Sequence, residues 1–189
     1  MTRRISKQLR IGKVAVGGDA PIVVQSMSKT DTRDIPATIN QIKQLEDSGC
    51  EMVRVAVPDG EAAESLVTIK KSVSLPIIAD IHFDYRLALG ALKAGVDGLR
   101  LNPGNIGDKD QIARVVAAAK ERGVPIRIGV NAGSLRADFQ PRAPLAERMV
   151  SMALDQIRLM ENLDFDLIKV SLKAFDVPTT IQAYQMIAD

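Results

Sequence analysis

Single polar side chains interrupt five short apolar runs of this sequence, each with the composition of a β-strand. The runs are MVRVAV, IIADIH, GLRLN, IRIGVN and LIKVS. Successive side chains of a strand point to opposite faces, so counting by two divides each run into two faces. One face is apolar, and the other carries Arg54, Asp80, His82, Arg100, Asn102, Arg127, Asn131, Lys169 and Ser171. Parallel strands covered by helices are normally apolar on both faces, so this pattern predicts a polar cavity that many strands share.

Helical spacings alternate with the strand-like runs along the chain. We expect strands at 21–27, 51–57, 76–81, 98–102, 125–131 and 166–171. We expect helices from 34 or 35 to 49, and at 60–73, 84–94, 108–122 and 144–162, with a last one from about 178. A hairpin turning around Gly17, Gly18 and Asp19 is expected to lead into the first strand. About six βα units indicate a parallel α/β structure.

Two architectures use this alternation, an open doubly wound sheet and a closed barrel. An open sheet binds its ligand with a few loops, whereas a barrel uses the C-terminal ends of many strands. The polar residues come from nearly every strand, which favours a TIM-type (β/α)8 barrel. A complete barrel takes about 250 residues. We therefore expect residues 1–189 to form an incomplete substrate-binding barrel domain, with about the first six units and an N-terminal hairpin.

Composition excludes several classes of protein. With 46% hydrophobic residues the chain can bury a sizeable core, and a net charge of +2 does not indicate a nucleic-acid surface. No apolar stretch of about 18 residues and no secretory signal are present, so we expect a cytoplasmic protein that does not enter a membrane. The single cysteine, Cys50, excludes a disulfide framework and any multi-cysteine metal site within this chain.

The three arginines of the polar face indicate an anionic ligand. Arg54, Arg100 and Arg127 cannot lose their charge on burial, and an unpaired buried guanidinium costs several kcal/mol. A phosphate or diphosphate group would satisfy them through charge-assisted hydrogen bonds. The alternative is that they form salt bridges with helices at the rim of the barrel.

The other polar residues of this face leave more than one interpretation open. His82 and Asp80 are candidates for proton transfer or substrate orientation, although a lone histidine is usually structural. Asn102 precedes a tight turn expected at Pro103 and Gly104, and can contact either the substrate or that loop. Asn131 is followed by Gly133 and Ser134, whose backbone N–H groups could face an anion. Lys169 could form a Schiff base or simply contact the anion, and the neighbouring arginines favour the second role.

Six motifs, taken in order, resemble the bacterial 4-hydroxy-3-methylbut-2-en-1-yl diphosphate synthase family. They are PIVVQSMSKTDT, VRVAVP, IADIHFDYRLAL, LRLNPGNIG, PIRIGVNAGSL and DLIKVSLKA, and together they span nearly the whole chain. The resemblance implies a TIM-type barrel that binds 2-C-methyl-D-erythritol 2,4-cyclodiphosphate. By motif, Arg54, Arg100, Arg127 and Lys169 correspond to a diphosphate clamp. Asp80, His82, Asn102, Asn131 and Ser171 would form the polar shell around it.

The resemblance also implies parts that this chain lacks. In the family, three cysteines and a glutamate of a C-terminal domain hold a [4Fe–4S] cluster, which passes two electrons to the substrate, opening its ring and removing a hydroxyl. The donor is flavodoxin or ferredoxin, and a homodimer brings one subunit's cluster domain over the partner's barrel. The barrel fragment alone should therefore be inactive. Two alternatives remain: a Schiff-base aldolase that uses Lys169, and a non-catalytic anion-binding barrel.

Overall fold

The computed structural model describes residues 5–82, 84–102, 108–135 and 138–188. A short hairpin, β1 (Leu9–Ile11) and β2 (Val14–Val16), precedes alternating strands and helices. The strands are β3 (Gln25–Met27), β4 (Met52–Ala56), β5 (Ile77–Ile81), β6 (Gly98–Leu101), β7 (Ile126–Asn131) and β8 (Ile168–Lys173). The helices are α1 (Ile35–Asp47), α2 (Gly60–Ser72), α3 (Tyr85–Ala94), α4 (Lys109–Arg122), α5 (Leu145–Glu161) and α6 (Val177–Ala188), with a 3₁₀ turn η1 (Ala132–Ser134) after β7.

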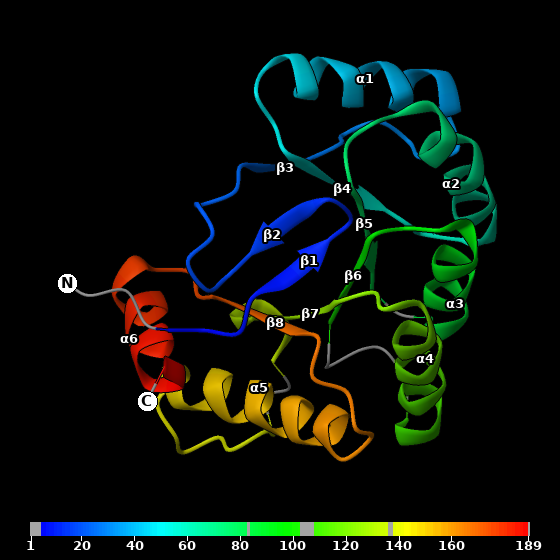
Figure 1. Ribbon diagram of the computed structural model, residues 1–189. Coiled ribbons are helices and arrows are strands. Elements are labelled where there is room, and N and C mark those ends of the chain that lie inside the picture. Colours follow the sequence, from blue (N-terminus) through cyan, green and yellow to red (C-terminus); the bar gives the residue numbers. More distant parts are fainter. Residues whose placement is uncertain (1–4, 83, 103–107, 136–137, 189) are drawn as a thin grey trace.

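Strands β3 to β8 form one parallel sheet in which every strand pairs with its neighbours in sequence. The helices follow one another around the outside of this sheet in chain order, from α1 to α6 (Figure 1). Sequential order with external helices is the arrangement of a barrel, since a doubly wound sheet reverses its strand order at a switch point. The structure confirms the expected partial barrel of six βα units.

Aspartates at the starts of four helices fix where the chain leaves the strand ends. Each accepts a hydrogen bond from a backbone N–H of the first helical turn, which satisfies a donor that has no partner inside the helix. These N-caps are Asp34, Asp59, Asp84 and Asp108, and their donors are the N–H groups of Ala37, Ala62, Arg86 and Gln111.

The apolar faces of the strands pack against the helices and form the main core. On β4 and β5, Val53, Val55 and Ile77 are fully buried, and Leu99 and Ile126 continue this layer on β6 and β7. Residues of opposite parity on the same strands face the barrel interior. The division of each run into an apolar and a polar face is therefore confirmed.

The hairpin β1–β2 covers the N-terminal end of the barrel interior (Figure 1). Ile11 packs there with Met52 and Ile78, the first interior-facing residues of β4 and β5, in a small separate apolar cluster. Buried apolar side chains exclude water, so this end of the interior is closed. The polar part of the interior opens toward the C-terminal ends of the strands.

The hairpin turn lies earlier in the chain than expected. We placed it around Gly17, Gly18 and Asp19, but the strands meet at Gly12 and Lys13, with Ile11 opposite Val14. Gly12 has φ +56°, and a two-residue hairpin turn requires a positive φ at its first central residue, which glycine adopts at least cost. Gly17, Gly18 and Asp19 instead follow the end of β2.

Two expected strands differ in extent from those observed. The first strand spans only Gln25–Met27 instead of 21–27, and it has a single neighbour, β4. Pro21 has no N–H to donate to a ladder, and the N–H of Val24 donates to the Glu51 side chain instead. The last strand, β8, begins and ends two residues later than the expected 166–171.

The helices are amphipathic rather than uniformly apolar. The longest described helix, α5, has 17 residues and buries one side, where Met149, Ala153 and Met160 contact the core. None of the helices in the described part of the chain combines the length and apolar character needed to cross a membrane.

Candidate anion-binding site

Four of the predicted site residues form one row across the sheet. The strand register places Asp80 of β5 opposite Arg100 of β6, Arg100 opposite Arg127 of β7, and Arg127 opposite Lys169 of β8. Directly opposite residues on adjacent strands have neighbouring side chains on the same face. The row therefore gathers three basic side chains and one carboxylate in the barrel interior.

Asp80 is the centre of this cluster. Its side chain is only 3% exposed, and its two oxygens lie 3.4 Å from Nε of Arg54 and 3.1 Å from Nη1 of Arg100. Arg54, on β4, lies two residues before Ala56, which is the residue opposite Asp80. The rim alternative predicted ion pairs with helices, whereas both arginines pair with a strand residue inside the barrel.

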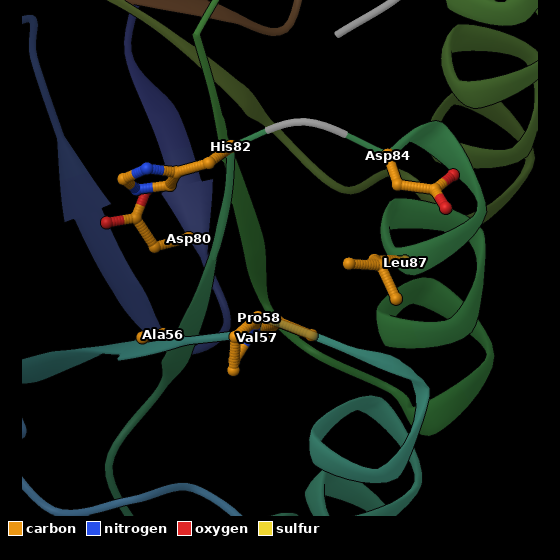
Figure 2. Close-up of a pocket in the computed structure, with 7 residues that line it drawn as sticks. All are labelled: Ala56, Val57, Pro58, Asp80, His82, Asp84 and Leu87. Atoms are coloured by element: carbon orange, nitrogen blue, oxygen red, sulfur yellow. The ribbon is translucent and has the colours of Figure 1, made fainter. Parts of the chain in front are cut away.

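His82 follows β5 and lies beside Asp80, and its ring Nε2 is 3.2 Å from Oδ1 of Asp80. The same nitrogen lies 3.3 Å from Nη1 of Arg100. The His82 side chain is 49% exposed, so one part of the ring contacts the cluster and another part faces the open end of the barrel. Figure 2 shows the Asp80 and His82 side chains close together on one side of β5.

Arg127 is the least satisfied cation of the cluster. Its Nε is buried and has no hydrogen-bond partner among the described residues, and the same holds for Nε of Arg100. Burial, followed by the charges of Arg54 and Arg100, lowers the pKa of Arg127 to about 10. Burial and the charge of Arg127 also lower the pKa of Lys169. Burial is the main cause of both shifts, and repulsion between neighbouring cations is the second.

Two further residues of the site were missed by the sequence analysis. Met27, at the end of β3, lies with its sulfur 3.2 Å and 3.1 Å from Nε and Nη2 of Arg54. A thioether is a weak acceptor, so this contact leaves Arg54 available to a stronger one. Gly129, on β7, lies under Arg100, whose Nη2 is 3.4 Å from the Gly129 carbonyl oxygen. Counting by two along IRIGVN places Gly129 on the same face as Arg127, and the same counting along QSM could have placed Met27.

The remaining predicted residues lie around the row. Asn102 directly follows β6 and is buried, while the turn expected at Pro103 and Gly104 lies outside the described residues. Asn131 ends β7, and its side-chain oxygen accepts a hydrogen bond from the N–H of Gly133. That N–H, which we considered for anion binding, is therefore already used. Ser171 of β8 faces Gly129 across the sheet, one layer above Lys169.

A pocket of about 320 Å³ lies beside the cluster, at the C-terminal ends of β4 and β5. Asp80 and His82 form one side of it, and Asp84 and Leu87 of the α3 region form another (Figure 2). Its remaining lining comes from Ala56, Val57 and Pro58. The side chain of Asp84 is held by Arg86, which also lowers the pKa of that carboxyl. The pocket leaves room for an uncharged part of a ligand next to the charged row.

Taken together, these contacts define an interior cluster with more cations than carboxylates. Arg54 and Arg100 pair with Asp80, Arg127 and Lys169 continue the row, and two of the guanidiniums have buried N–H groups without acceptors in the described part of the chain. Guanidinium forks bind phosphate and carboxylate groups through paired hydrogen bonds. No group of three or more His, Cys, Asp or Glu residues that could hold a metal ion occurs among the described residues.

The comparison with protein families decides where the chain belongs. The family described as the GcpE TIM-barrel domain matches residues 6–189. The chain is a member of this family. A 4-hydroxy-3-methylbut-2-en-1-yl diphosphate synthase (flavodoxin) of Dehalococcoides mccartyi is 63% identical over 188 residues, covering 100% of this chain. One from Geobacter sulfurreducens is 58% identical over 97% of it. This barrel domain spans about half of these curated relatives, 54% and 52% of their lengths.

Solved structures of other enzymes share the fold of this barrel domain at low sequence identity. The 3-dehydroquinate dehydratase of Geobacillus kaustophilus superposes with a TM-score of 0.67 at 16% identity, over 98% of this chain and 76% of that one. The 7,8-dihydropteroate synthase of Vibrio fischeri gives a TM-score of 0.60 at 13% identity, over 88% and 66%. At such identities the likeness concerns the fold alone.

Proposed function

We propose that this chain is the substrate-binding barrel of a 4-hydroxy-3-methylbut-2-en-1-yl diphosphate synthase. The complete protein would reduce 2-C-methyl-D-erythritol 2,4-cyclodiphosphate, opening its ring and removing a hydroxyl. The observation that carries the proposal is the gathering of Arg54, Arg100, Arg127 and Lys169 with one carboxylate, Asp80, because a diphosphate supplies the negative charge that this cluster lacks. Relatives of this name at 63% and 58% identity support it.

Within this proposal the site residues have different roles. Arg54, Arg100, Arg127 and Lys169 bind the two phosphate groups, with Asn102, Asn131 and Ser171 around them. Asp80 is too buried to reach the substrate freely, so it positions Arg54 and Arg100. The half-exposed His82 is the better candidate to contact the reacting part of the substrate and to exchange a proton with it. The pocket beside it would take the carbon skeleton.

The redox part of the reaction needs groups from elsewhere in the complete protein. A [4Fe–4S] cluster supplies electrons one at a time, and it is usually held by several cysteine thiolates. The residues here do not fit such a cluster, because Cys50 is the one cysteine of the sequence and is buried behind β4. We therefore place the cluster ligands outside this chain, and propose flavodoxin as the electron donor, ferredoxin being the alternative. We further propose a cytoplasmic homodimer.

We expect Arg100→Ala and Arg127→Ala each to weaken cyclodiphosphate binding by about 1.5 to 3 kcal/mol, the usual contribution of a hydrogen bond to a charged group. Isothermal titration calorimetry on the complete protein measures this. Arg158→Ala is the matched control, since Arg158 lies on the outer surface of α5 and pairs there with Asp155. Unchanged affinity in both site variants would refute the anion site.

Lys169 supports a second candidate, a Schiff-base aldolase. Burial and the charge of Arg127 lower the pKa of its amine, and a neutral amine is the form that attacks a carbonyl carbon. For this candidate we expect borohydride to trap a covalent adduct between Lys169 and a phosphorylated aldehyde or ketone, detected by peptide mass spectrometry. Lys169→Arg serves as the control that keeps the charge. If no adduct forms at Lys169 and diphosphate binds tightly, the result favours the synthase. If the complete protein binds the cyclodiphosphate but does not convert it, the result favours a non-catalytic barrel.

A further inference from the structure

Gly129 occupies an unusual position for a glycine, in the middle of the parallel strand β7. Glycine weakens a strand, because it loses more backbone freedom than other residues and packs no side chain. Gly129 is also not among the glycines with a positive φ, so its backbone conformation is open to other residues. The reason for a glycine here must therefore be space.

The space beside Gly129 is filled by Arg100 from the neighbouring strand. A Cβ atom added to Gly129 would lie 2.6 Å from Nε, 3.0 Å from Nη2 and 3.2 Å from Cζ of Arg100. These are its three nearest neighbours, and the first distance is too short for any real Cβ contact. The guanidinium therefore lies flat against the backbone of β7, where Nη2 also reaches the Gly129 carbonyl oxygen at 3.4 Å.

We propose that Gly129 is a positioning residue that strengthens anion binding by leaving room for the Arg100 guanidinium. The inference rests on the proposed diphosphate site and names the residue that shapes it. With any side chain at position 129, the guanidinium has to leave the β7 backbone and cannot keep its contact with Asp80, 3.1 Å away, in the same geometry. The paired donors of Arg100 would then no longer match those of Arg127 in the row.

A methyl group at Gly129 should leave the rest of the fold intact. The three nearest atoms all belong to the Arg100 guanidinium and none to the backbone, so the displacement is confined to this side chain and its contacts. The neighbours Ile128 and Val130 point to the opposite face and pack in the main core, away from the added methyl. A change in ligand binding can therefore be separated from a change in folding.

Gly98 provides a matched control on the next strand. It also faces the barrel interior, and a Cβ there would meet Ile78 at 3.3 Å and Ile11 at 3.5 Å, in the apolar layer under the hairpin. Gly98→Ala thus adds the same methyl to the same cavity wall without touching a guanidinium. Any effect on anion binding that is specific to Gly129 should be absent from this variant.

The test is a double-mutant cycle between Gly129→Ala and Arg100→Lys in the complete protein, with inorganic diphosphate as the probe in calorimetry. Lysine keeps the charge but lacks the planar fork that fills the space over Gly129. We expect each single variant to lose about tenfold in diphosphate affinity, the scale of one charged hydrogen bond. Gly129→Ala should cost less than about twofold in the Arg100→Lys background, because coupled residues are not additive.

Each result of the cycle has a separate meaning. Two results overturn the role of Gly129 and leave the proposed function standing. One is that the losses of affinity in the two single variants add up in the double variant. The other is that Gly129→Ala keeps its affinity while Arg100→Lys binds weakly. Unchanged affinity in Arg100→Lys also overturns that role, because the planar fork of Arg100 would then not be needed. Failure of the unsubstituted protein to bind diphosphate would instead refute the proposed function. If Gly129→Ala does not fold, the double variant is examined for folding. A folded double variant supports the clash with the guanidinium. If neither variant folds, Gly129 serves strand packing alone.

Discussion

Asp80→Asn is expected to lower the free energy of unfolding by about 3 kcal/mol when no anion is bound, because removing one partner of a buried ion pair leaves the other charges uncompensated. Asp80 is 3% exposed and holds both Arg54 and Arg100. Asparagine has nearly the same shape, so packing is retained while the charge is lost. Urea unfolding of the complete protein, followed by circular dichroism, measures the difference.

Added diphosphate should partly reverse the effect of Asp80→Asn. An anion that binds only the folded state stabilises it by an amount that grows with the logarithm of its concentration over its Kd, and the variant has more uncompensated cations to attract it. The stability gap between variant and wild type should therefore narrow as inorganic diphosphate is added. A gap that stays constant would show that the uncompensated cations of the variant do not strengthen diphosphate binding.

Asp164→Asn is the matched control for loss of a carboxylate. Asp164 lies on the surface, 2.6 Å from Lys120, and an exposed ion pair contributes little to stability. Its backbone φ of +56° is one that asparagine adopts readily. We expect no measurable change in unfolding. If Asp80→Asn is equally silent, the buried cluster does not depend on its carboxylate.

Arg127→Met is expected to have the opposite effect on stability, raising the free energy of unfolding by about 1 to 2 kcal/mol, since an apolar side chain of similar length can replace a buried charge favourably. Arg127 has a buried Nε without an acceptor among the described residues, and Arg54 and Arg100 repel it. The same change should weaken diphosphate binding by about 1.5 to 3 kcal/mol. A more stable protein that binds its ligand poorly would show that Arg127 is retained for binding.

The stability gained in Arg127→Met should depend on pH. The pKa of Arg127 is lowered to about 10 in the folded protein, so above that pH the unfolded chain binds more protons than the folded one. Stability then rises with pH through this group, and its unfavourable contribution is fully present below pH 10. We expect the advantage of the variant to be complete at pH 7 to 9 and to shrink above pH 10. A constant advantage across this range would contradict the shift.

Arg158→Met is the control for these two expectations, because it removes an arginine from the outer surface of α5. It should change neither the unfolding midpoint nor diphosphate affinity. A comparable gain in stability from Arg158→Met would mean that replacing any arginine by methionine stabilises the protein.

The alternation of strands and helices could be predicted from the sequence because it depends on local patterns. Period-two alternation placed Arg54, Asp80 and Lys169 on one face of their strands, and the structure confirms that parity. The expected helices agree with the observed ones to within a few residues, since aspartates such as Asp59 mark their first turns. The hairpin turn was misplaced because two glycine-containing segments were equally suitable by local rules, and only the pairing of Ile11 with Val14 distinguishes them.

The sequence alone determined that a polar face with several arginines would line the interior of a parallel barrel, and it predicts an anionic ligand. The tertiary structure decided which of these charges meet. Strand register, a long-range property, placed Asp80, Arg100, Arg127 and Lys169 in one row and made Asp80 the partner of Arg54. It also packed the Arg100 guanidinium over Gly129. Charges interact through space, so their pairing follows from how the strands align rather than from their order in the chain.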